Sequence, residues 1–159
     1  MDKTIALRTL ILLLAVCTQS KALPKPVTNC LARHPDLSID LKQKPPYLQL
    51  HFTAAGKPDY VVAVREPESD RYRALVCMYN GQDFVLGARA GKQPFSDMKD
   101  DNYMSSSWRV CAKKEVAEFR QYYKDVPEPV NEAVCLVWED AEALIYWDGK
   151  QLRWKSFWP

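Results

Sequence analysis

Apolar and polar residues alternate over several short stretches of the chain, a pattern typical of β-strands that bury one face. The alternation is clearest over residues 47–53, where Leu48, Leu50 and Phe52 share one side of the strand. Further strands are expected at residues 60–64, 71–79, 132–138 and 143–147, with a short edge strand at 37–41. The pattern therefore predicts a protein built mainly from antiparallel β-structure.

Two dipeptides, Asn80-Gly81 and Asp148-Gly149, follow strand-like runs and predict two-residue hairpin turns. We expect the first turn to pair Tyr79 with Gln82 and the second to pair Trp147 with Lys150. In the second hairpin, one apolar face then carries Ile145, Trp147, Leu152 and Trp154. The opposite face carries Leu144, Tyr146, Gln151, Arg153 and Lys155.

One amphipathic helix is expected between the two groups of strands. Its apolar stripe follows the helical period at Ala112, Val116, Phe119 and Tyr123, and Pro127 prevents any continuation. The polar stretch at residues 89–107 is expected to form a loop. The predicted fold class is α+β: a meandering antiparallel sheet of about seven strands with one amphipathic helix packed on it.

The first 22 residues have the composition of a secretory signal peptide. Lys3 and Arg8 precede an apolar run at residues 10–16, and small residues at Ser20 and Ala22 mark a cleavage site. The run is too short to cross a bilayer as a helix. We therefore expect a signal peptide at 1–22, a proline-rich extended leader at 23–46 and a single β-rich domain at 47–159. Cys17 offers an alternative, in which a lipid on this cysteine anchors the protein to a membrane.

The export signal carries the whole charge excess of the chain. The full sequence holds 22 basic and 20 acidic residues, and removal of the signal leaves 19 of each. A formally neutral protein lacks the basic surface that nucleic acids and anionic lipids require, so neither is an expected partner. The apolar fraction of 47% and the charged fraction of 26% are typical of a globular domain.

Four cysteines remain after cleavage: Cys30, Cys77, Cys111 and Cys135. An even number in an exported protein predicts two disulfides. Cys77 and Cys135 lie in strand-like runs while the other two lie in irregular surroundings, which favours Cys77–Cys135 with Cys30–Cys111 and leaves the other two pairings open. Their spacing does not match a zinc site, so no metal or other cofactor is expected.

The segment at residues 56–62, with the sequence GKPDYVV, places a glycine and an aspartate just before an apolar strand, and residues 84–88 add an FVLGA strand. This pattern resembles the FG-GAP or VCBS type of repeat, which builds β-propellers in integrins and in secreted bacterial proteins. The resemblance implies a single strand–loop–strand unit over residues 48–88 and favours a binding module. The family's calcium-binding aspartates are replaced here by His51, Thr53 and Ala55, so calcium is not expected.

Few residues in the chain point to catalysis. His34 lies in the proline-rich leader, and His51 is expected on the polar face of a strand. Three acidic residues, Asp97, Asp100 and Asp101, fall in the polar loop, where a solvated cluster is the favoured interpretation. Five tryptophans occupy the last third of the chain, at positions 108, 138, 147, 154 and 158.

These observations favour an exported, non-enzymatic binding module of the periplasm or the extracellular space, recognising a protein partner as an inhibitor or immunity protein does. The expected binding surface comprises Tyr146, Arg153, Lys155 and Trp158. Two alternatives stay open. Exposed aromatic residues would suit a carbohydrate or cell-wall ligand, and His51 with Asp59 as its acidic partner would suit a small hydrolase.

Overall fold

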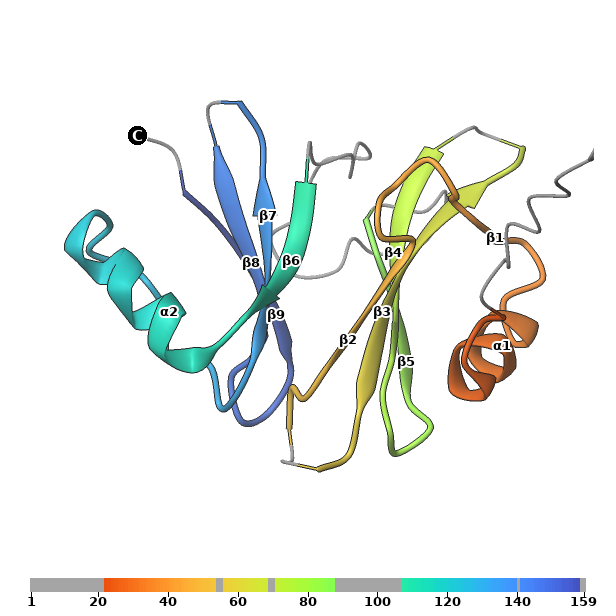
Figure 1. Cartoon of the computed structure of the whole chain (residues 1–159), viewed down its shortest axis with the longest axis horizontal. Coiled ribbons are helices and arrows are strands. Elements are labelled where there is room, and N and C mark those ends of the chain that lie inside the picture. The colour runs from red at the N-terminus through yellow and green to blue at the C-terminus, as the bar shows by residue number, and fades with distance from the viewer. Residues whose placement is uncertain (1–21, 54–55, 69–70, 88–106, 140, 158–159) are drawn as a thin grey trace, which may run out of the picture.

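The computed structural model describes residues 22–53, 56–68, 71–87, 107–139 and 141–157. In this part of the chain two antiparallel sheets face each other, and each sheet carries a short helix on its outer side (Figure 1). The layers therefore run helix, sheet, sheet, helix, and the core lies between the two sheets.

The first sheet is formed by the N-terminal half of the chain. Its central strands are β3 (Asp59–Glu66) and β4 (Arg71–Cys77), and β5 (Asp83–Leu86) lies beside β4. Strand β3 pairs on its other side with both β1 (Ser38–Ile39) and β2 (Tyr47–Leu50). The edge strand expected near residue 38 and the strands expected from residues 47, 60 and 71 are thus confirmed.

The second sheet is a four-stranded meander formed by the C-terminal half. Its strands are β6 (Ser107–Cys111), β7 (Ala133–Val137), β8 (Glu142–Trp147) and β9 (Leu152–Phe157), in that order. Helix α2 (Lys113–Glu118) and the 3₁₀ helix η1 (Phe119–Gln121) connect β6 to β7. The helix expected from the stripe at 112–123 is therefore confirmed at Val116, which is fully buried, and at Phe119, whereas Ala112 is the exposed N-cap and Tyr123 follows the segment.

The inner faces of both sheets build one shared hydrophobic core. Val61 and Val76 of the first sheet and Leu136 and Ile145 of the second are fully buried within it. Strands β2 and β6 lie next to each other across the two sheets, and the indole Nε1 of Trp108 donates a hydrogen bond of 2.8 Å to the carbonyl oxygen of Pro45. These contacts close the sandwich along that side.

The structure differs from the expected single sheet in the number of sheets and in the number of strands. The described residues form nine strands in two sheets instead of about seven in one sheet. The additional strands are mainly β6, which lies where a loop was expected to end, and β9, which follows the second hairpin turn. In β6, Trp108 faces the core while Arg109 faces outward. The sequence did not predict β6 because it has only five residues and follows a polar stretch, so its alternation of buried and exposed residues is short.

The proline-rich leader is not wholly extended, which corrects the expectation for residues 23–46. Residues Lys25–Ala32 form helix α1, with Pro24 at the N-cap and Pro26 within the first turn. Proline is tolerated there because the first backbone N–H groups of a helix have no partner within the helix. Val27 and Cys30 face the outer side of the first sheet and are fully buried, so the leader is part of the packed structure.

Both hairpin turns differ from the expected register. Met78 pairs with Gln82, which leaves a three-residue loop with Gly81 at φ 86°, and the β4–β5 register is shifted by one residue. In the second hairpin Asp148 pairs with Gln151 and Trp147 with Leu152. A shift by two residues preserves the faces, so the expected apolar face containing Ile145 and Trp154 is confirmed.

The favoured disulfide pairing is wrong. Cys30 of α1 is bonded to Cys77 of β4, and Cys111 of β6 is bonded to Cys135 of β7. Cys77 and Cys135 lie on the outer faces of different sheets, with the core between them, and so cannot meet. The strand-like surroundings of both cysteines were correctly identified, but they do not reveal which sheet each strand joins.

A buried arginine determines how closely the end of β5 approaches β4. Arg73 is 1% exposed, and its Nη1 donates to the carbonyl oxygen of Tyr72 at 2.9 Å. A Cβ atom at Gly87, where φ is 102°, would lie 2.9 Å from the Arg73 Cδ atom. Glycine is therefore required here for its backbone conformation and for its lack of a side chain.

We expect Gly87→Ala to destabilise the protein more than Gly81→Ala. At Gly81 φ is 86°, but a Cβ atom there would meet no atom within 4 Å, so only backbone strain of about 1–2 kcal/mol applies. At Gly87 the contact with Arg73 adds about 1–3 kcal/mol. Urea denaturation of both variants measures the difference, and equal losses would contradict the role assigned to the arginine.

Candidate functional site

The second sheet turns one face away from the core, and this outer face carries most of the residues expected to bind. Strand register places three rows of side chains across it. The first row contains Ser107, Val137, Glu142 and Phe157; the second contains Arg109, Cys135, Leu144 and Lys155; the third contains Cys111, Ala133, Tyr146 and Arg153. We refer to these residues as the outer face.

The helical segment covers part of the outer face. Val116 and Phe119 pack against Cys135 and Leu144 in a small hydrophobic cluster. The ring of Tyr123 stacks on Phe157, with the ring centroids 4.9 Å apart. The segment begins after the disulfide cysteine Cys111, so the crosslink holds it close to the sheet.

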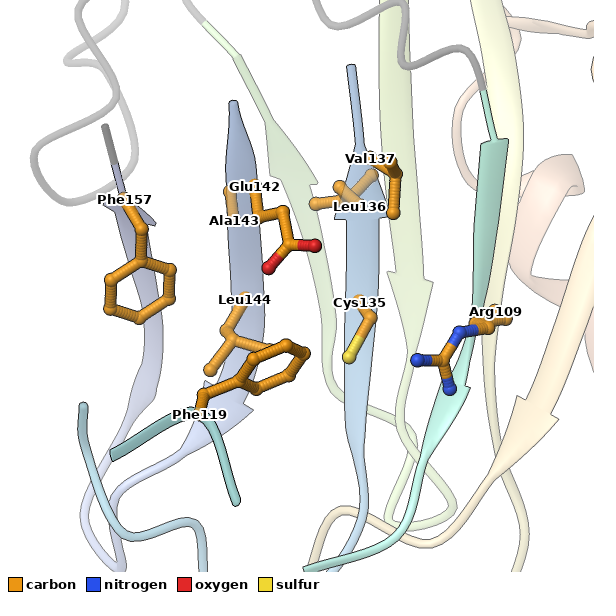
Figure 2. Close-up of a pocket in the computed structure, with 9 residues that line it drawn as sticks. All are labelled: Arg109, Phe119, Cys135, Leu136, Val137, Glu142, Ala143, Leu144 and Phe157. Atoms are coloured by element: carbon orange, nitrogen blue, oxygen red, sulfur yellow. The ribbon is translucent and has the colours of Figure 1, made fainter. Parts of the chain in front are cut away.

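Beside η1 the cover leaves a shallow hollow that is open to solvent and has room for about one water molecule (Figure 2). Its apolar floor and walls include Phe119, Val137 and Leu144. Two charged residues, Arg109 of β6 and Glu142 of β8, stand beside this apolar surface on different strands. An apolar depression bordered by charged residues has the core-and-rim distribution that is common in protein–protein interfaces.

The charges around the hollow are unequally compensated. Arg109 forms an ion pair with Glu115 of α2, and the Lys155 ammonium lies 4.0 Å from an Asp125 carboxylate oxygen. Glu142 is half-buried, and no described residue forms an ion pair or hydrogen bond with its carboxylate. A half-buried carboxylate without a counter-charge can accept hydrogen bonds from an incoming donor.

Three of the four expected binding residues fall within the described chain, and all three lie on the outer face. Tyr146 is half-buried against the cluster under α2. The Arg153 Nε donates a 2.7 Å hydrogen bond to Asp148 and, with the backbone N–H groups of the turn, lowers the pKa of Asp148 to about 2. Lys155 pairs with Leu144, one of the residues that line the hollow, and Trp158 lies outside the described residues.

Sequence reasoning missed the residues that shape the hollow. Arg109 belongs to a strand that was not expected, and Phe119 was assigned only to the helix stripe. The alternation that ends with Leu144 and Tyr146 also includes Glu142, and this signal identifies the acidic residue as a member of the same face.

His51 lies where the two sheets meet. Asp59 was expected to be its acidic partner, but the His51 ring contacts Glu132, and Asp59 is near enough only for a charge interaction. The His51 ring Nδ1 is 3.1 Å from Glu132 Oε2, and the same oxygen accepts the backbone N–H of His51 at 2.6 Å. The nearest chain neighbour with a hydroxyl, Thr53, has a buried Oγ1 without a hydrogen-bond partner. This arrangement connects the end of β2 to the start of β7.

Asp59 is fully buried and organises backbone groups. Its Oδ2 accepts the N–H of Phe52 at 2.9 Å, and its Oδ1 accepts the N–H of Tyr79 at 2.8 Å. Burial raises the pKa of the Asp59 carboxyl, although these donors and the nearby His51 act in the opposite direction. The carboxylate therefore joins the β2–β3 connection to the β4–β5 turn.

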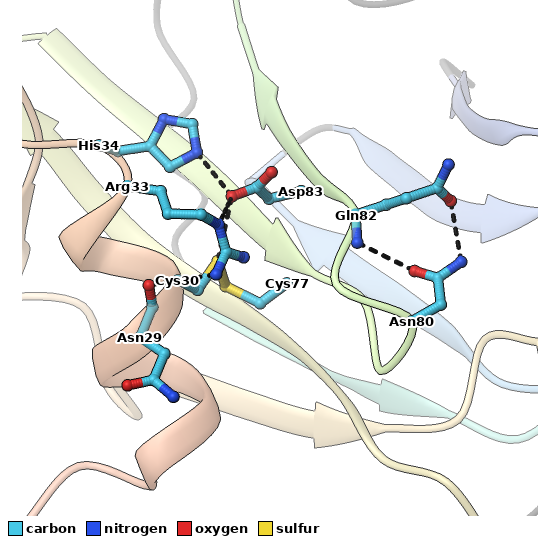
Figure 3. A network of polar contacts seen from close by, with 8 residues as sticks. All are labelled: Asn29, Cys30, Arg33, His34, Cys77, Asn80, Gln82 and Asp83. Atoms are coloured by element: carbon cyan, nitrogen blue, oxygen red, sulfur yellow. Dashed lines mark hydrogen bonds and ion pairs between the residues drawn. A yellow bond between two sulfur atoms is a disulfide. The ribbon is translucent and has the colours of Figure 1, made fainter.

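The other histidine belongs to a polar network that fastens α1 to β5 (Figure 3). One oxygen of Asp83, Oδ2, lies 2.9 Å from both Arg33 Nε and His34 Nε2. Burial acts to raise the pKa of Asp83, but the hydrogen bonds and charges of Arg33 and His34 outweigh it and lower the pKa. Sequence reasoning placed His34 in an extended leader and so gave it no partner.

The tryptophans of the described chain pack toward the core. Trp108 is 3% exposed, and Trp138, Trp147 and Trp154 are partly buried against the shared core. The rings of Trp138 and Trp154 meet at 70°, which is an edge-to-face contact rather than a flat platform. Trp158 and the acidic residues Asp97, Asp100 and Asp101 lie outside the described residues.

Within the described ranges no three metal-ligating side chains come together, and no helix there is long and apolar enough to cross a membrane. Comparison of the chain with protein-family models, curated proteins and solved structures finds no match.

We expect Asp59→Asn to lower the free energy of unfolding by about 1–3 kcal/mol, because an amide nitrogen would face a backbone donor that now has an acceptor. Asp40→Asn is the matched control. Asp40 is also buried but accepts one backbone N–H, that of Lys42 at 2.9 Å, which an amide oxygen can replace. Chemical denaturation compares the two variants, and a larger loss at Asp40 would contradict this role for Asp59.

We expect the loss of stability in Asp83→Asn to depend on pH. A carboxyl whose pKa is lowered on folding stabilises the protein fully above its unfolded pKa of about 3.9 and loses that effect as the pH falls through the lower folded value. The gap in unfolding free energy between wild type and variant is thus largest at neutral pH and closes in acid. Glu118→Gln, in an exposed carboxylate that forms no ion pair with a described residue, serves as the control, and a gap constant with pH would contradict the assignment.

Proposed function

We propose that this chain is an exported, non-enzymatic binding module that recognises a protein partner through the outer face of its second sheet. One observation carries the proposal: the hollow between η1 and β8 combines an apolar floor with a half-buried carboxylate, Glu142, that has no partner among the described residues. Contacts of this kind concentrate binding energy at a small, desolvated centre surrounded by polar residues.

The surrounding residues support the same assignment. Arg109 lines the hollow and Lys155 pairs with the lining residue Leu144. The disulfide between Cys111 and Cys135 holds α2 against the sheet. A surface held in place before binding loses little conformational entropy when a partner docks. Two disulfides are also what an oxidising compartment outside the cytosol would favour.

The alternatives receive less support from the geometry. A carbohydrate site needs an exposed aromatic platform, and the described tryptophans lie against the core, two of them edge to face. A hydrolase based on His51 needs a nucleophile that substrate can reach, and the hydroxyl of Thr53 is buried.

Photo-cross-linking tests the proposal. A cross-linking residue at position 142 is expected to capture one protein from envelope or medium extract, whereas the same residue at position 25, on α1 across the molecule, captures none. Charge reversal by Glu142→Lys or Lys155→Glu is then expected to weaken binding of the captured partner about tenfold, or about 1.4 kcal/mol. Lys25→Glu is the matched control for charge.

Capture at position 25 but not at position 142, or equal losses for all three charge variants, would contradict the proposed surface. Retention of every variant on cell-wall material, without a captured protein, would favour the carbohydrate alternative.

A further inference from the structure

The chain contains two turns in which a residue with an acidic or amide side chain precedes a glycine: Asn80-Gly81 and Asp148-Gly149. Such pairs share one chemical risk, because a glycine N–H is unhindered and can attack the neighbouring side-chain carbonyl carbon. Whether the attack occurs depends on how that side chain is held and on its charge. The two turns of this protein differ in both respects.

We propose that Asn80 is a site of spontaneous deamidation, that Asp148 is protected from the equivalent isomerisation, and that Gln82 sets the rate at Asn80. In the reaction, the backbone nitrogen of Gly81 forms a bond to Asn80 Cγ, and the Cγ–Nδ2 bond breaks. The proton of the Gly81 N–H is transferred through solvent, and ammonia leaves. Water then opens the cyclic imide at either carbonyl and yields an aspartyl or isoaspartyl linkage at position 80.

Asn80 is exposed at the tip of the β4–β5 hairpin, where water can reach the imide. A Cβ atom at Gly81 would meet no atom within 4 Å, so the space on this side of the turn is open. The other asparagines of the described chain are less reactive by sequence, since Asn29 precedes Cys30 and Asn131 precedes Glu132. A side chain on the following residue hinders the attacking nitrogen.

The native turn restrains the reaction without preventing it. The carboxamide is held by Gln82, since Asn80 Oδ1 accepts the Gln82 N–H at 3.0 Å and Asn80 Nδ2 donates to Gln82 Oε1 at 2.9 Å (Figure 3). The attacking group is also occupied, because the Gly81 N–H donates to the carbonyl oxygen of Met78 at 3.0 Å. Deamidation therefore requires these contacts to open, and the side chain of Gln82 is the one contact that a substitution can remove.

The Asp148 turn is held more firmly. Asp148 Oδ1 accepts the N–H groups of Lys150 and Gln151 at 2.8 and 2.9 Å, and Oδ2 accepts the Arg153 Nε at 2.7 Å. The hydrogen bond from Arg153 is the largest cause of its pKa of about 2, so the group is an ionised carboxylate near neutrality. The carbon of a carboxylate is a poor electrophile, and its oxygen leaves as water only after protonation, so attack by the Gly149 nitrogen is slow.

Ageing of the intact, oxidised protein tests the proposal. The protein is incubated at mildly alkaline pH below its unfolding temperature, and peptide mapping by mass spectrometry follows amide loss and isoaspartate at each position. We expect conversion at Asn80 to exceed that at Asn29 and Asn131 several-fold, with no isomerisation at Asp148. Gln82→Ala is expected to accelerate conversion at Asn80 several-fold, whereas Gln151→Ala, the matched change in the other turn, leaves it unchanged.

Conversion at Asn80 no faster than at Asn131 would overturn the assignment of the site, and isomerisation at Asp148 at a similar rate would overturn the contrast between the turns. An unchanged rate in Gln82→Ala would overturn the role of Gln82. Thermal denaturation of Gln82→Ala and Gln151→Ala shows whether faster conversion at Asn80 arises from global unfolding. If the conversion rate at Asn80 rises with loss of stability to the same extent in both variants, the role of Gln82 is also overturned.

Discussion

The buried carboxylate of Asp59 is the constraint on which the arrangement of the first sheet depends. It begins β3, the strand that pairs with three others, and it accepts backbone N–H groups from the end of β2 and from the β4–β5 turn. An apolar residue at this position would leave those donors buried without acceptors. His51, one residue before Phe52, extends the same connection to Glu132 of the second sheet. The carboxylate thus fixes the strand ends at the boundary between the sheets.

The two halves of the molecule are built alike. Each consists of an antiparallel sheet whose inner face joins the shared core and whose outer face is partly covered by a short helical segment. Each also has one disulfide on its outer side, at Cys30–Cys77 and at Cys111–Cys135. Helices of eight and six residues are too short to be stable alone. Their packing and the nearby crosslinks hold them in place, which is how the outer surfaces acquire a defined shape.

Local pattern predicted much of this structure. Alternation identified β2, β3, β4, β7 and β8, and the spacing of Val116 and Phe119 identified the helical segment. The disulfide pairing and helix α1 were predicted wrongly because both depend on contacts between distant parts of the sequence. The partner of Cys77 depends on which sheet its strand joins, and a helix at α1 depends on burial of Val27 against a sheet formed later in the chain. The turn positions failed for a local reason, because Asn80 and Asp148 cap their turns with side-chain hydrogen bonds instead of occupying the expected positions.

The candidate site was predictable in part for the same reason. Tyr146, Arg153 and Lys155 share a face because strand alternation places them there, and that needs no knowledge of the fold. The hollow next to them forms only where the segment after β6 packs Phe119 over the sheet. Arg109, which lines it, lies on β6, a strand that the sequence pattern did not predict. The partners of Arg153 and Lys155 are likewise visible only once Asp148 and Asp125 have been brought near them by the turn and the segment after α2.

The position of the two disulfides has a consequence for the integrity of the chain. Cys30–Cys77 lies wholly within residues before 88, and Cys111–Cys135 lies wholly after 106, so no disulfide between described cysteines joins the two halves. A single backbone cut between residues 88 and 106 would yield two internally crosslinked fragments joined by noncovalent contacts alone, those of the shared core above all. After such a cut, the shared core would act as the interface between two fragments, each held by its own disulfide.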